Sequence, residues 1–366
     1  MNNQQNNPDI SSYLYQRAGE KGIPLGGNFE LTPRCNMNCK MCYIRMTEKE
    51  MALLGRERTV DEWLDIANQA KDAGMLFLLL TGGEPLLYDG FWELYRELKK
   101  MGLLISINTN AVLMTDDIIS KFIELPPYKM NVTVYGGSDE TYSRLCRCPG
   151  GFEKAVGAVK KLKSAGIYVK INGSITPENV DDIDACFNLA KDVGAPCSLG
   201  CYMFPPVRRA GQQSNRFAAL EAGKNQAIID KIRYFKKDFD DIIKKIDSAE
   251  RGECPEDIPF AFRCRAGRSS FWITWNGKMN ACGMMDSFEL DPLKDGFLSC
   301  WEKINQSICS TEALIGCKGC PNREICKVCP AIAYAETGDV NGKPEYICEM
   351  LNSWKEQMKL LNSSEE

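Results

Sequence analysis

Three cysteines near the amino terminus form the most informative group of residues in this 366-residue chain. Cys35, Cys39 and Cys42 stand at C-x3-C-x2-C spacing in the run LTPRCNMNCKMCY, directly after a predicted strand. Three soft thiolates this close can hold three corners of a four-iron cluster and leave its fourth iron open for chemistry. The alternatives are a three-ligand zinc site or unpaired reduced thiols, although zinc sites usually supply their thiolates in paired C-x2-C hooks.

A second segment, TGGEP at residues 81–85, lies at the end of the next predicted strand. Alone, this segment would be a weak turn signal. Together and in this order, the two motifs resemble those of the radical SAM enzymes, whose cysteine triad has this spacing and is followed by an aromatic residue, here Tyr43. The resemblance implies that the open iron chelates S-adenosylmethionine and that Gly82, Gly83 and Glu84 contact its methionyl ammonium. Tyr43 would lie near its adenine.

Charge and hydropathy limit the partners that we expect. The formal net charge of -4 argues against a nucleic-acid binder, which would show a basic patch. No apolar run approaches the ~20 residues that span a bilayer. The polar start MNNQQNNPDISS lacks the charged and apolar regions of a signal peptide. We therefore expect a cytoplasmic protein with no nucleic-acid partner and no membrane partner.

The counts of cysteine and histidine point to metal. Eighteen cysteines in a cytosolic chain do not indicate a disulfide framework, because thiols stay reduced there. The chain has no histidine, so it lacks the commonest acid-base residue and the commonest nitrogen ligand. Haem, zinc-hydrolase and Ser-His-Asp schemes are disfavoured for the same reason.

Short apolar runs alternate with amphipathic stretches between residues 28 and 204, a pattern typical of strand-helix units around a parallel sheet. We expect six strands, at residues 28–32, 76–81, 103–108, 130–134, 168–173 and 197–203. The predicted fold is α/β, a partial (β/α)6 TIM-like barrel. Between the strands, Thr59 and Glu62 form a capping box that opens a helix. Further helices are expected at residues 91–101, after Thr115, at residues 152–165 and after Pro177.

Functional groups of such a barrel gather at the carboxyl ends of its strands. The triad, the GGEP segment and Asn110 all fall there. In radical SAM enzymes a TN pair follows the strand after GGEP, and this match implies a ribose contact for Asn110. The segment from Thr133 to Arg144 resembles the family's S-x-D-G segment and its downstream arginine, which implies contacts of these two residues to the methionyl carboxylate. Tyr135 stands in place of the usual acidic residue, and turn chemistry plus a surface arginine is the alternative.

The chain is expected to divide into five parts. These are an amino-terminal segment (1–27), the partial barrel (28–215), a charged helical linker (216–253), a cysteine-rich domain (254–352) and a tail (353–366). In the linker Ile228, Ile232, Phe235 and Phe239 recur at helical spacing, which predicts one apolar face packed on the barrel.

Cysteines crowd again after the linker. Their spacing alone leaves a zinc ribbon and iron sites open. Their order, with Gly277 between Cys264 and Cys282, then a C-x2-C-x5-C cluster and a late lone cysteine, resembles the SPASM extension of radical SAM enzymes, which binds two auxiliary four-iron clusters. The resemblance assigns the outer cluster to Cys317, Cys320, Cys326 and Cys348.

The inner auxiliary cluster would be held by Cys264, Cys282 and Cys329. The spacing before Cys329 is x2 where the family usually has x3. Its fourth ligand is either Cys254 or a thiol of the substrate. With the triad, the resemblance implies three 4Fe-4S clusters and S-adenosylmethionine as cofactors.

The resemblance also implies the chemistry of an oxidoreductase that modifies peptides. A reduced cluster gives one electron to the sulfonium, and the resulting 5′-deoxyadenosyl radical takes a hydrogen atom from an unactivated carbon. We expect a maturase of a ribosomally made peptide that forms a thioether or another crosslink. An electron donor such as flavodoxin or ferredoxin is implied. Because the stretch before the first strand is too short for a leader-binding module, a separate partner or the barrel face would capture the leader.

Three alternatives remain. Anaerobic sulfatase maturases have an aspartate directly after the cysteine that matches Cys282, whereas this chain has Gly283. A small-molecule radical SAM dehydrogenase would act without a leader peptide. A zinc-stabilised binding protein would have no activity.

Two further thiols, Cys146 and Cys148, have two possible roles. They either donate a hydrogen atom or touch the substrate, or they are reduced structural thiols.

Overall fold

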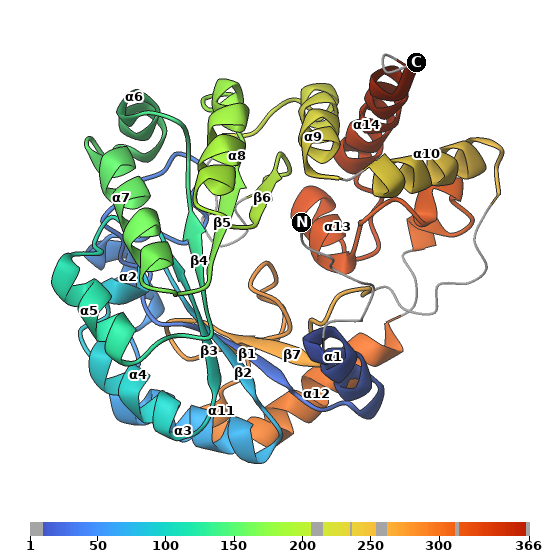
Figure 1. The fold of residues 1–366 in the computed structure, drawn as a ribbon. Helices are drawn as coiled ribbons and strands as arrows, with labels where there is room; N and C mark the ends of the chain where they lie inside the picture. The colour runs from blue at the N-terminus through green and yellow to red at the C-terminus, as the bar shows by residue number, and fades with distance from the viewer. Residues whose placement is uncertain (1–9, 206–214, 235, 254–261, 312–314, 364–366) are drawn as a thin grey trace. The chain divides into compact units, whose positions relative to one another are not determined.

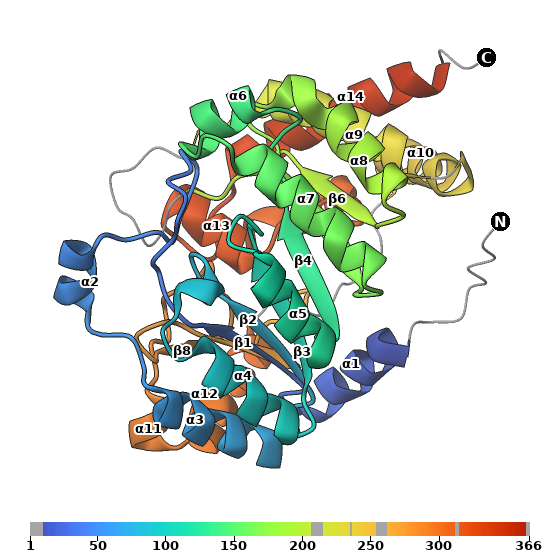
Figure 2. The same ribbon diagram turned by 60° about the vertical axis from the view of Figure 1, so that its left-hand side comes forward.

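The computed structural model describes residues 10–205, 215–234, 236–253, 262–311 and 315–363 (Figures 1 and 2). By its internal contacts the chain divides into two compact units. The first comprises Met1–Pro33, Met46–Ser106 and Phe262–Thr311. The second comprises Arg34–Arg45, Ile107–Ala261 and Glu312–Glu366. The boundaries that the sequence suggests for its five parts stay a prediction.

The first unit is built around β1 (Gly26–Glu30). This strand pairs in parallel with β2 (Phe77–Thr81) on one side and with β7 (Ser270–Ile273) on the other, and β7 pairs antiparallel with β8 (Met279–Asn280). Phe29 is fully buried and stacks on Trp63 with ring centroids 4.8 Å apart. A central strand that is buried on both faces holds the start of the following loop in place.

Seven helical segments lie among the described residues of the first unit. They are α1 (Ile10–Lys21), α2 (Glu48–Leu54), α3 (Val60–Asp72), the short 3-10 helix η1 (Pro85–Leu87), α4 (Phe91–Lys100), α11 (Pro292–Asp295) and α12 (Phe297–Ser310). The start of α12 is tied to α3, because the Phe297 amide donates to Gln69 Oε1 at 2.9 Å.

The predicted capping box at the start of α3 is confirmed. The Glu62 amide donates to Thr59 Oγ1 at 3.2 Å, and the Thr59 amide donates to Glu62 Oε2 at 2.8 Å. Arg56 also donates to the Glu62 carboxylate, which lowers the pKa of Glu62 to about 2. The predicted apolar face of the helix is buried and comprises Trp63, Ile66, Ala67 and Ala70.

We expect Thr59→Ala to lower the free energy of unfolding by about 1 kcal/mol, since it leaves amides at the start of a packed helix without their partner. Urea unfolding followed by circular dichroism measures this change. Thr47→Ala is the matched control, because Thr47 makes the same capping box on α2, a helix that buries no side chain. An equal loss of stability in both variants would contradict the assigned role of α3.

The second unit contains β4 (Lys129–Thr133), β5 (Val169–Ser174) and β6 (Cys197–Gly200), which pair in parallel in this order. The strand β3 (Leu104–Thr109) runs across the boundary of the two units. In Figure 1, α7 and α8 lie along the outer side of β4 and β5. Its helices up to β6 are α5 (Asp116–Glu124), α6 (Asp139–Thr141), the π-helical η2 (Tyr142–Cys146), α7 (Gly151–Ser164), η3 (Val180–Asp182) and α8 (Ile183–Asp192).

The carboxyl-terminal half of the second unit is helical. It contains α9 (Ala219–Arg233), α10 (Lys236–Glu250), η4 (Ile315–Cys317), η5 (Pro321–Arg323), α13 (Pro330–Thr337) and α14 (Glu345–Ser363). The helices α9 and α14 lie side by side in Figures 1 and 2. A Cβ atom on Gly223 of α9 would collide with the Met350 carbonyl oxygen of α14, so only glycine permits this close approach.

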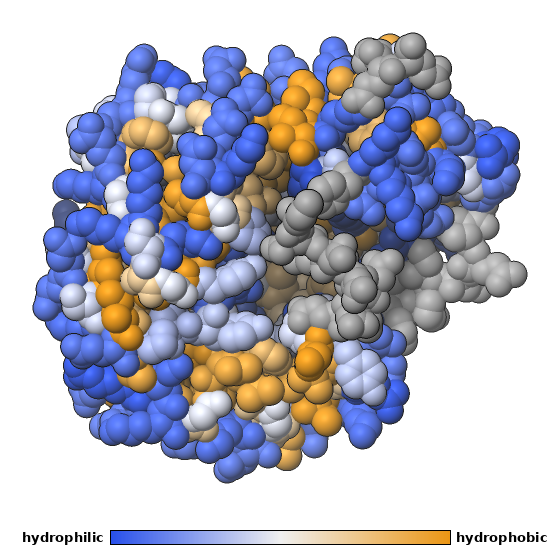
Figure 3. Space-filling view, in the orientation of Figure 1, coloured by the Kyte–Doolittle hydropathy of each residue, from blue (hydrophilic) through white to orange (hydrophobic). Residues whose placement is uncertain are grey.

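All six predicted strands form, each within three residues of its predicted limits. The charged stretch expected as a linker consists of two helices, α9 and α10. No helix among the described residues is long and apolar enough to cross a membrane. On the face drawn in Figure 3, hydrophilic residues predominate and the hydrophobic ones lie in separate groups between them.

Candidate functional site

The cysteine triad lies in the loop between β1 and α2. Cys35, Cys39 and Cys42 are half-buried free thiols. The Met37 amide donates to Cys35 Sγ at 3.4 Å, and the Arg45 amide donates to Cys42 Sγ at 3.3 Å. Backbone donors aimed at sulfur favour the thiolate, which is the form that binds metal.

The loop of the triad is bound along its backbone to the π-helical segment η2. The Asn38 amide donates to the Cys146 carbonyl at 3.0 Å, and the Lys40 amide donates to the Leu145 carbonyl at 3.1 Å. Cys146 is fully buried and donates a hydrogen bond to Cys39, and this bond is the largest influence that lowers the pKa of Cys39. The same bond, together with burial, raises the pKa of the Cys146 thiol. Cys146 is therefore the donor and Cys39 the acceptor of this bond.

Tyr135 also donates a hydrogen bond to Cys39. In the family pattern an acidic residue stands at this position, so the departure from the pattern places a hydrogen-bond donor, and not a second negative charge, beside the triad. Burial and the neighbouring thiolates raise the pKa of Tyr135, which keeps its hydroxyl protonated. A neutral donor suits a site that collects thiolates.

Asn110 contacts the triad directly. It is 6% exposed, and its Nδ2 lies 3.7 Å from Cys35 Sγ and donates to Asn36 Oδ1 at 2.9 Å. The sequence predicts a ribose contact for Asn110 and gives no indication of its bond to Asn36. The structure brings this residue to the edge of the triad loop, and its role toward a nucleotide stays a prediction.

Arg144 and Thr133 lie on the same unit as the triad. Thr133 is half-buried at the carboxyl end of β4. The Arg144 guanidinium donates to the Glu178 carbonyl at 2.6 Å and lies 3.6 Å from its carboxylate. Glu178 also pairs with Lys40 of the triad loop at 2.5 Å. Glu178 thus contacts both Arg144 and Lys40 near the triad. Sequence reasoning missed Glu178 because no local motif marks it.

The GGE segment lies in the first unit, after β2. A Cβ atom on Gly82, whose φ is +152°, would collide with the Thr32 carbonyl oxygen, which accepts a bond from the Gly83 amide at 2.7 Å. Glu84 is fully buried and accepts a hydrogen bond from the Leu86 amide at 3.3 Å. A buried carboxylate at a strand end is rare unless it has a partner or a ligand. Tyr43 is half-buried in the triad loop of the second unit.

Four cysteines of the carboxyl-terminal part line one small cavity of about 60 Å³ in the second unit. They are Cys317, Cys320, Cys326 and Cys348, the predicted ligands of the outer cluster. Val328, Ile347 and Leu351 complete its apolar wall. Burial is the largest influence that raises the pKa of Cys317, Cys326 and Cys348, so metal binding there must release protons. Four soft sulfur donors that line one small cavity fit a four-iron cluster.

Within the described ranges no three cysteine or acidic side chains converge closely enough for a single metal ion. A four-iron cluster is larger than an ion, and its ligands stand farther apart. The seventeen cysteines that the structure describes are all free thiols. The triad and the small cavity each bring together thiols, the donors that iron-sulfur clusters take.

The predicted ligands of the inner cluster are divided between the units. Cys264 is exposed and Cys282 is half-buried in the first unit, whereas Cys329 precedes α13 in the second. Cys254 lies outside the described residues. A Cβ atom on Gly283 would lie 2.8 Å from the Trp272 ring, so an aspartate there would require the indole to move. The inner ligand set stays a prediction.

Comparison with known proteins gives a family and a fold. The sequence model of the Radical SAM superfamily matches residues 29–205. The AdoMet-dependent heme synthase of Methanosarcina barkeri is 27% identical over 335 residues, which cover 85% of this chain and 92% of the relative. The sporulation killing factor maturation protein SkfB of Bacillus subtilis is 23% identical over 267 residues, which cover 72% of this chain and 61% of the relative.

Two solved structures are similar over almost the whole chain. Streptococcus suis SuiB bound to its precursor peptide SuiA has a TM-score of 0.68 at 16% identity, covering 95% of this chain and 83% of that one. Native anSMEcpe with bound AdoMet has a TM-score of 0.68 at 17% identity, covering 93% and 99%. The chain therefore has their α/β fold, and the predicted partial barrel with a cysteine-rich carboxyl-terminal part is confirmed.

Proposed function

We propose that this enzyme, whose residues 29–205 match the sequence model of the Radical SAM superfamily, is a maturase of a ribosomally made peptide. The proposal combines cysteines that fit two clusters with relatives named as peptide maturases. The observation that carries it is the triad loop, in which the Met37 and Arg45 amides donate to the sulfur atoms of Cys35 and Cys42. When bound, the cluster and S-adenosylmethionine together supply the 5′-deoxyadenosyl radical that takes a hydrogen atom from the peptide.

The protein's own residues hold and orient these groups. Cys35, Cys39 and Cys42 hold the first cluster, and the backbone bonds from Asn38 and Lys40 fix their loop. The buried Glu84 carboxylate accepts hydrogen bonds from the methionyl ammonium, since it is the acidic group at the end of β2. The proposed contacts to S-adenosylmethionine come from Tyr43, Gly82, Gly83, Glu84, Asn110, Thr133 and Arg144.

Two auxiliary clusters complete the proposed cofactor set. The cavity lined by Cys317, Cys320, Cys326 and Cys348 supports the outer one. Cys264, Cys282 and Cys329 would hold the inner one, with Cys254 or a substrate thiol as its fourth ligand. These clusters accept the electron left on the substrate or position a substrate thiol, and either role suits a reaction that forms a thioether.

A peptide substrate is supported by the names of several relatives. SkfB is a maturation protein for a sporulation killing factor, and other relatives are named mycofactocin maturase MftC and PqqA peptide cyclase. SuiB, whose fold this chain shares, was solved with its precursor peptide. The proposal also includes an electron donor such as flavodoxin or ferredoxin, and capture of the leader either by a separate partner or by the barrel face.

A second candidate function is radical chemistry on a small molecule. The relatives named AdoMet-dependent heme synthase favour it, because this chain covers 92% and 88% of two of them. Such an enzyme would need no leader peptide. The two candidates share the first cluster and S-adenosylmethionine and differ only in the substrate.

The test uses protein purified without oxygen and reduced with dithionite. We expect 5′-deoxyadenosine from S-adenosylmethionine, detected by liquid chromatography. Co-expression with a short cysteine-containing peptide encoded beside the gene is expected to give a product lighter by one pair of hydrogen atoms in mass spectrometry. An unchanged peptide together with conversion of an added iron porphyrin would favour the second candidate. Absence of 5′-deoxyadenosine would reject both.

A further inference from the structure

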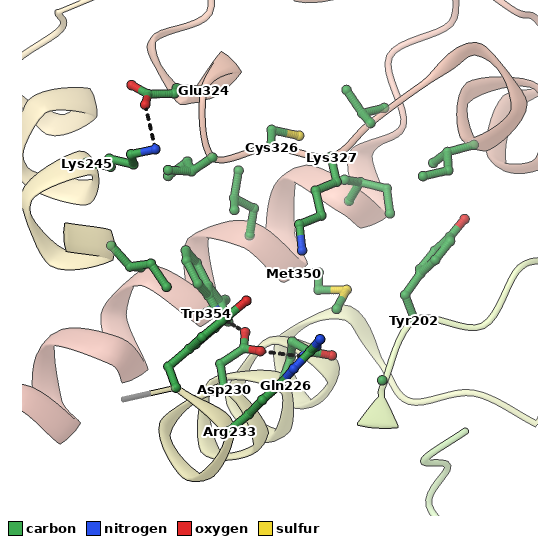
Figure 4. A pocket seen from close by; sticks show the side chains of 18 of the residues that line it. Tyr202, Gln226, Asp230, Arg233, Lys245, Glu324, Cys326, Lys327, Met350 and Trp354 are labelled. Atoms are coloured by element: carbon green, nitrogen blue, oxygen red, sulfur yellow. Dashed lines mark hydrogen bonds and ion pairs between the residues drawn. The ribbon is translucent and has the colours of Figure 1, made fainter. Parts of the chain in front are cut away.

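A larger cavity, of about 570 Å³, lies in the second unit next to the four-cysteine cavity (Figure 4). Its walls come from α9, α10, α14 and the segment of residues 324–328. Cys326, Val328, Ile347 and Leu351 line both cavities, so the two share a wall. No step proposed above uses this space. Its volume lies within the ~300–1,000 Å³ of cavities that hold small organic molecules.

Most of the lining is apolar and part of it is aromatic. The rings of Tyr234, which directly follows α9, and of Trp354 on α14 line the cavity, together with Ile242, Ile325 and Met350. Figure 4 shows Trp354 and Met350 rising from α14 into the same space. A lining of this kind favours a flat, apolar body over a hydrated sugar or a free phosphate, because burial of apolar surface supplies the affinity.

The charged side chains that line the cavity differ in the partners that they contact. Lys245 pairs with Glu324 at 2.9 Å. Asp230 is 8% exposed and accepts hydrogen bonds from Trp354 Nε1 at 3.0 Å and from Gln226 Nε2 at 3.1 Å. Glu324 and Asp230, the two carboxylates that line the cavity, therefore both have partners among its side chains.

Two cations remain, Lys327 and Arg233. Lys327 makes no hydrogen bond or ion pair with any residue that the structure describes. The Arg233 guanidinium lies 5.8 Å from the centre of the Tyr234 ring, and both Arg233 and Lys327 interact electrostatically with the Asp230 carboxylate. Figure 4 shows Lys327 reaching from the segment of residues 324–328 toward α9, which carries Arg233. Asp230 is the carboxylate of the lining that opposes these two cations, so the lining keeps an excess of positive charge. The lining of the cavity is therefore mostly apolar and carries an excess of positive charge.

We propose that this cavity binds a flat, mostly apolar organic anion, with its acid group at Lys327 and Arg233 and its ring system against Trp354 and Met350. An amphipathic aromatic acid matches both the apolar lining and the excess of positive charge, whereas a neutral ligand matches the apolar lining alone. The inference rests on the geometry of the second unit alone. It holds whether or not the enzyme acts on a peptide.

The test measures binding of two matched probes to the cluster-loaded enzyme by calorimetry without oxygen. The anionic probe is anilinonaphthalene sulfonate, and the neutral one is phenylnaphthylamine, which has the same rings without the acid. We expect one site per chain and tighter binding of the anion. Lys327→Gln is expected to lower the affinity for the anionic probe by about five- to tenfold, because it removes one exposed charge-assisted bond. The affinity for the neutral probe is expected to stay unchanged.

Two further variants separate this site from other surfaces. Lys318→Gln makes the same charge change nine positions earlier, at a lysine outside the cavity lining, and is expected to change neither affinity. Met350→Trp places a larger side chain in the cavity and is expected to lower the affinity for both probes. Equal affinities of wild type and Lys327→Gln for the anion would overturn the proposal, as would an equal loss in Lys318→Gln. Formation of 5′-deoxyadenosine in the same samples reports separately on the proposed function.

Discussion

Cys39→Ser is expected to lower the rate of 5′-deoxyadenosine formation by about a thousandfold or more, the scale of losing an essential catalytic group. A serine hydroxyl is a hard, weakly acidic ligand that cannot replace a soft thiolate on iron. The triad offers only three sulfur ligands, so one substitution leaves the cluster with two. The measurement is single-turnover cleavage of S-adenosylmethionine under reduction, together with the iron content of the purified variant.

Cys146→Ser is the matched control, since Cys146 lies in hydrogen-bond contact with Cys39 but is not a predicted ligand. Serine keeps a donor at this position, so we expect a loss within about tenfold, the value of one altered hydrogen bond. Iron content is expected to stay unchanged. Equal losses of iron and activity in the two variants would place Cys146 among the ligands and contradict the assignment of the triad.

The local features of the fold follow from the sequence because they depend on neighbouring residues. Thr59 and Glu62 are three positions apart, and their capping box forms as predicted. Thr115 caps α5 for the same reason. The division of the expected linker into α9 and α10 was not predicted. The helix α9 ends at Arg233 with Tyr234 in an extended conformation, and neither glycine nor proline marks this end.

The candidate site shows which contacts could not be predicted from the sequence. The motifs identify Cys35, Cys39 and Cys42 because their spacing is local. The neighbours of these thiols come from far along the chain. Asn110 reaches Cys35 across 75 positions, and Lys40 pairs with Glu178 across 138. Contacts at such separations are fixed by the packing of strands and helices, and one sequence carries no local signal for them.

Of the four predicted outer ligands, Cys326 offers the sharpest test, because it lines both cavities of the second unit. Cys326→Ala is expected to reduce the iron content by about four atoms per chain, which is one cluster of three. Because the triad is untouched, we expect cleavage of S-adenosylmethionine without peptide to continue. Crosslinking of the peptide is expected to fall in mass spectrometry, since one of the two proposed electron acceptors would be lost.

Cys197→Ala provides the comparison, because Cys197 is also half-buried in the second unit but belongs to no predicted ligand set. Its iron content and crosslinking are expected to match those of the wild type. If both variants keep all their iron, the small cavity is a structural cluster of thiols. If Cys326→Ala loses iron but still crosslinks the peptide, the outer cluster supports the fold around α14 and takes no part in electron transfer. The two measurements together therefore separate a ligand role of Cys326 from a redox role of the cluster that it would hold.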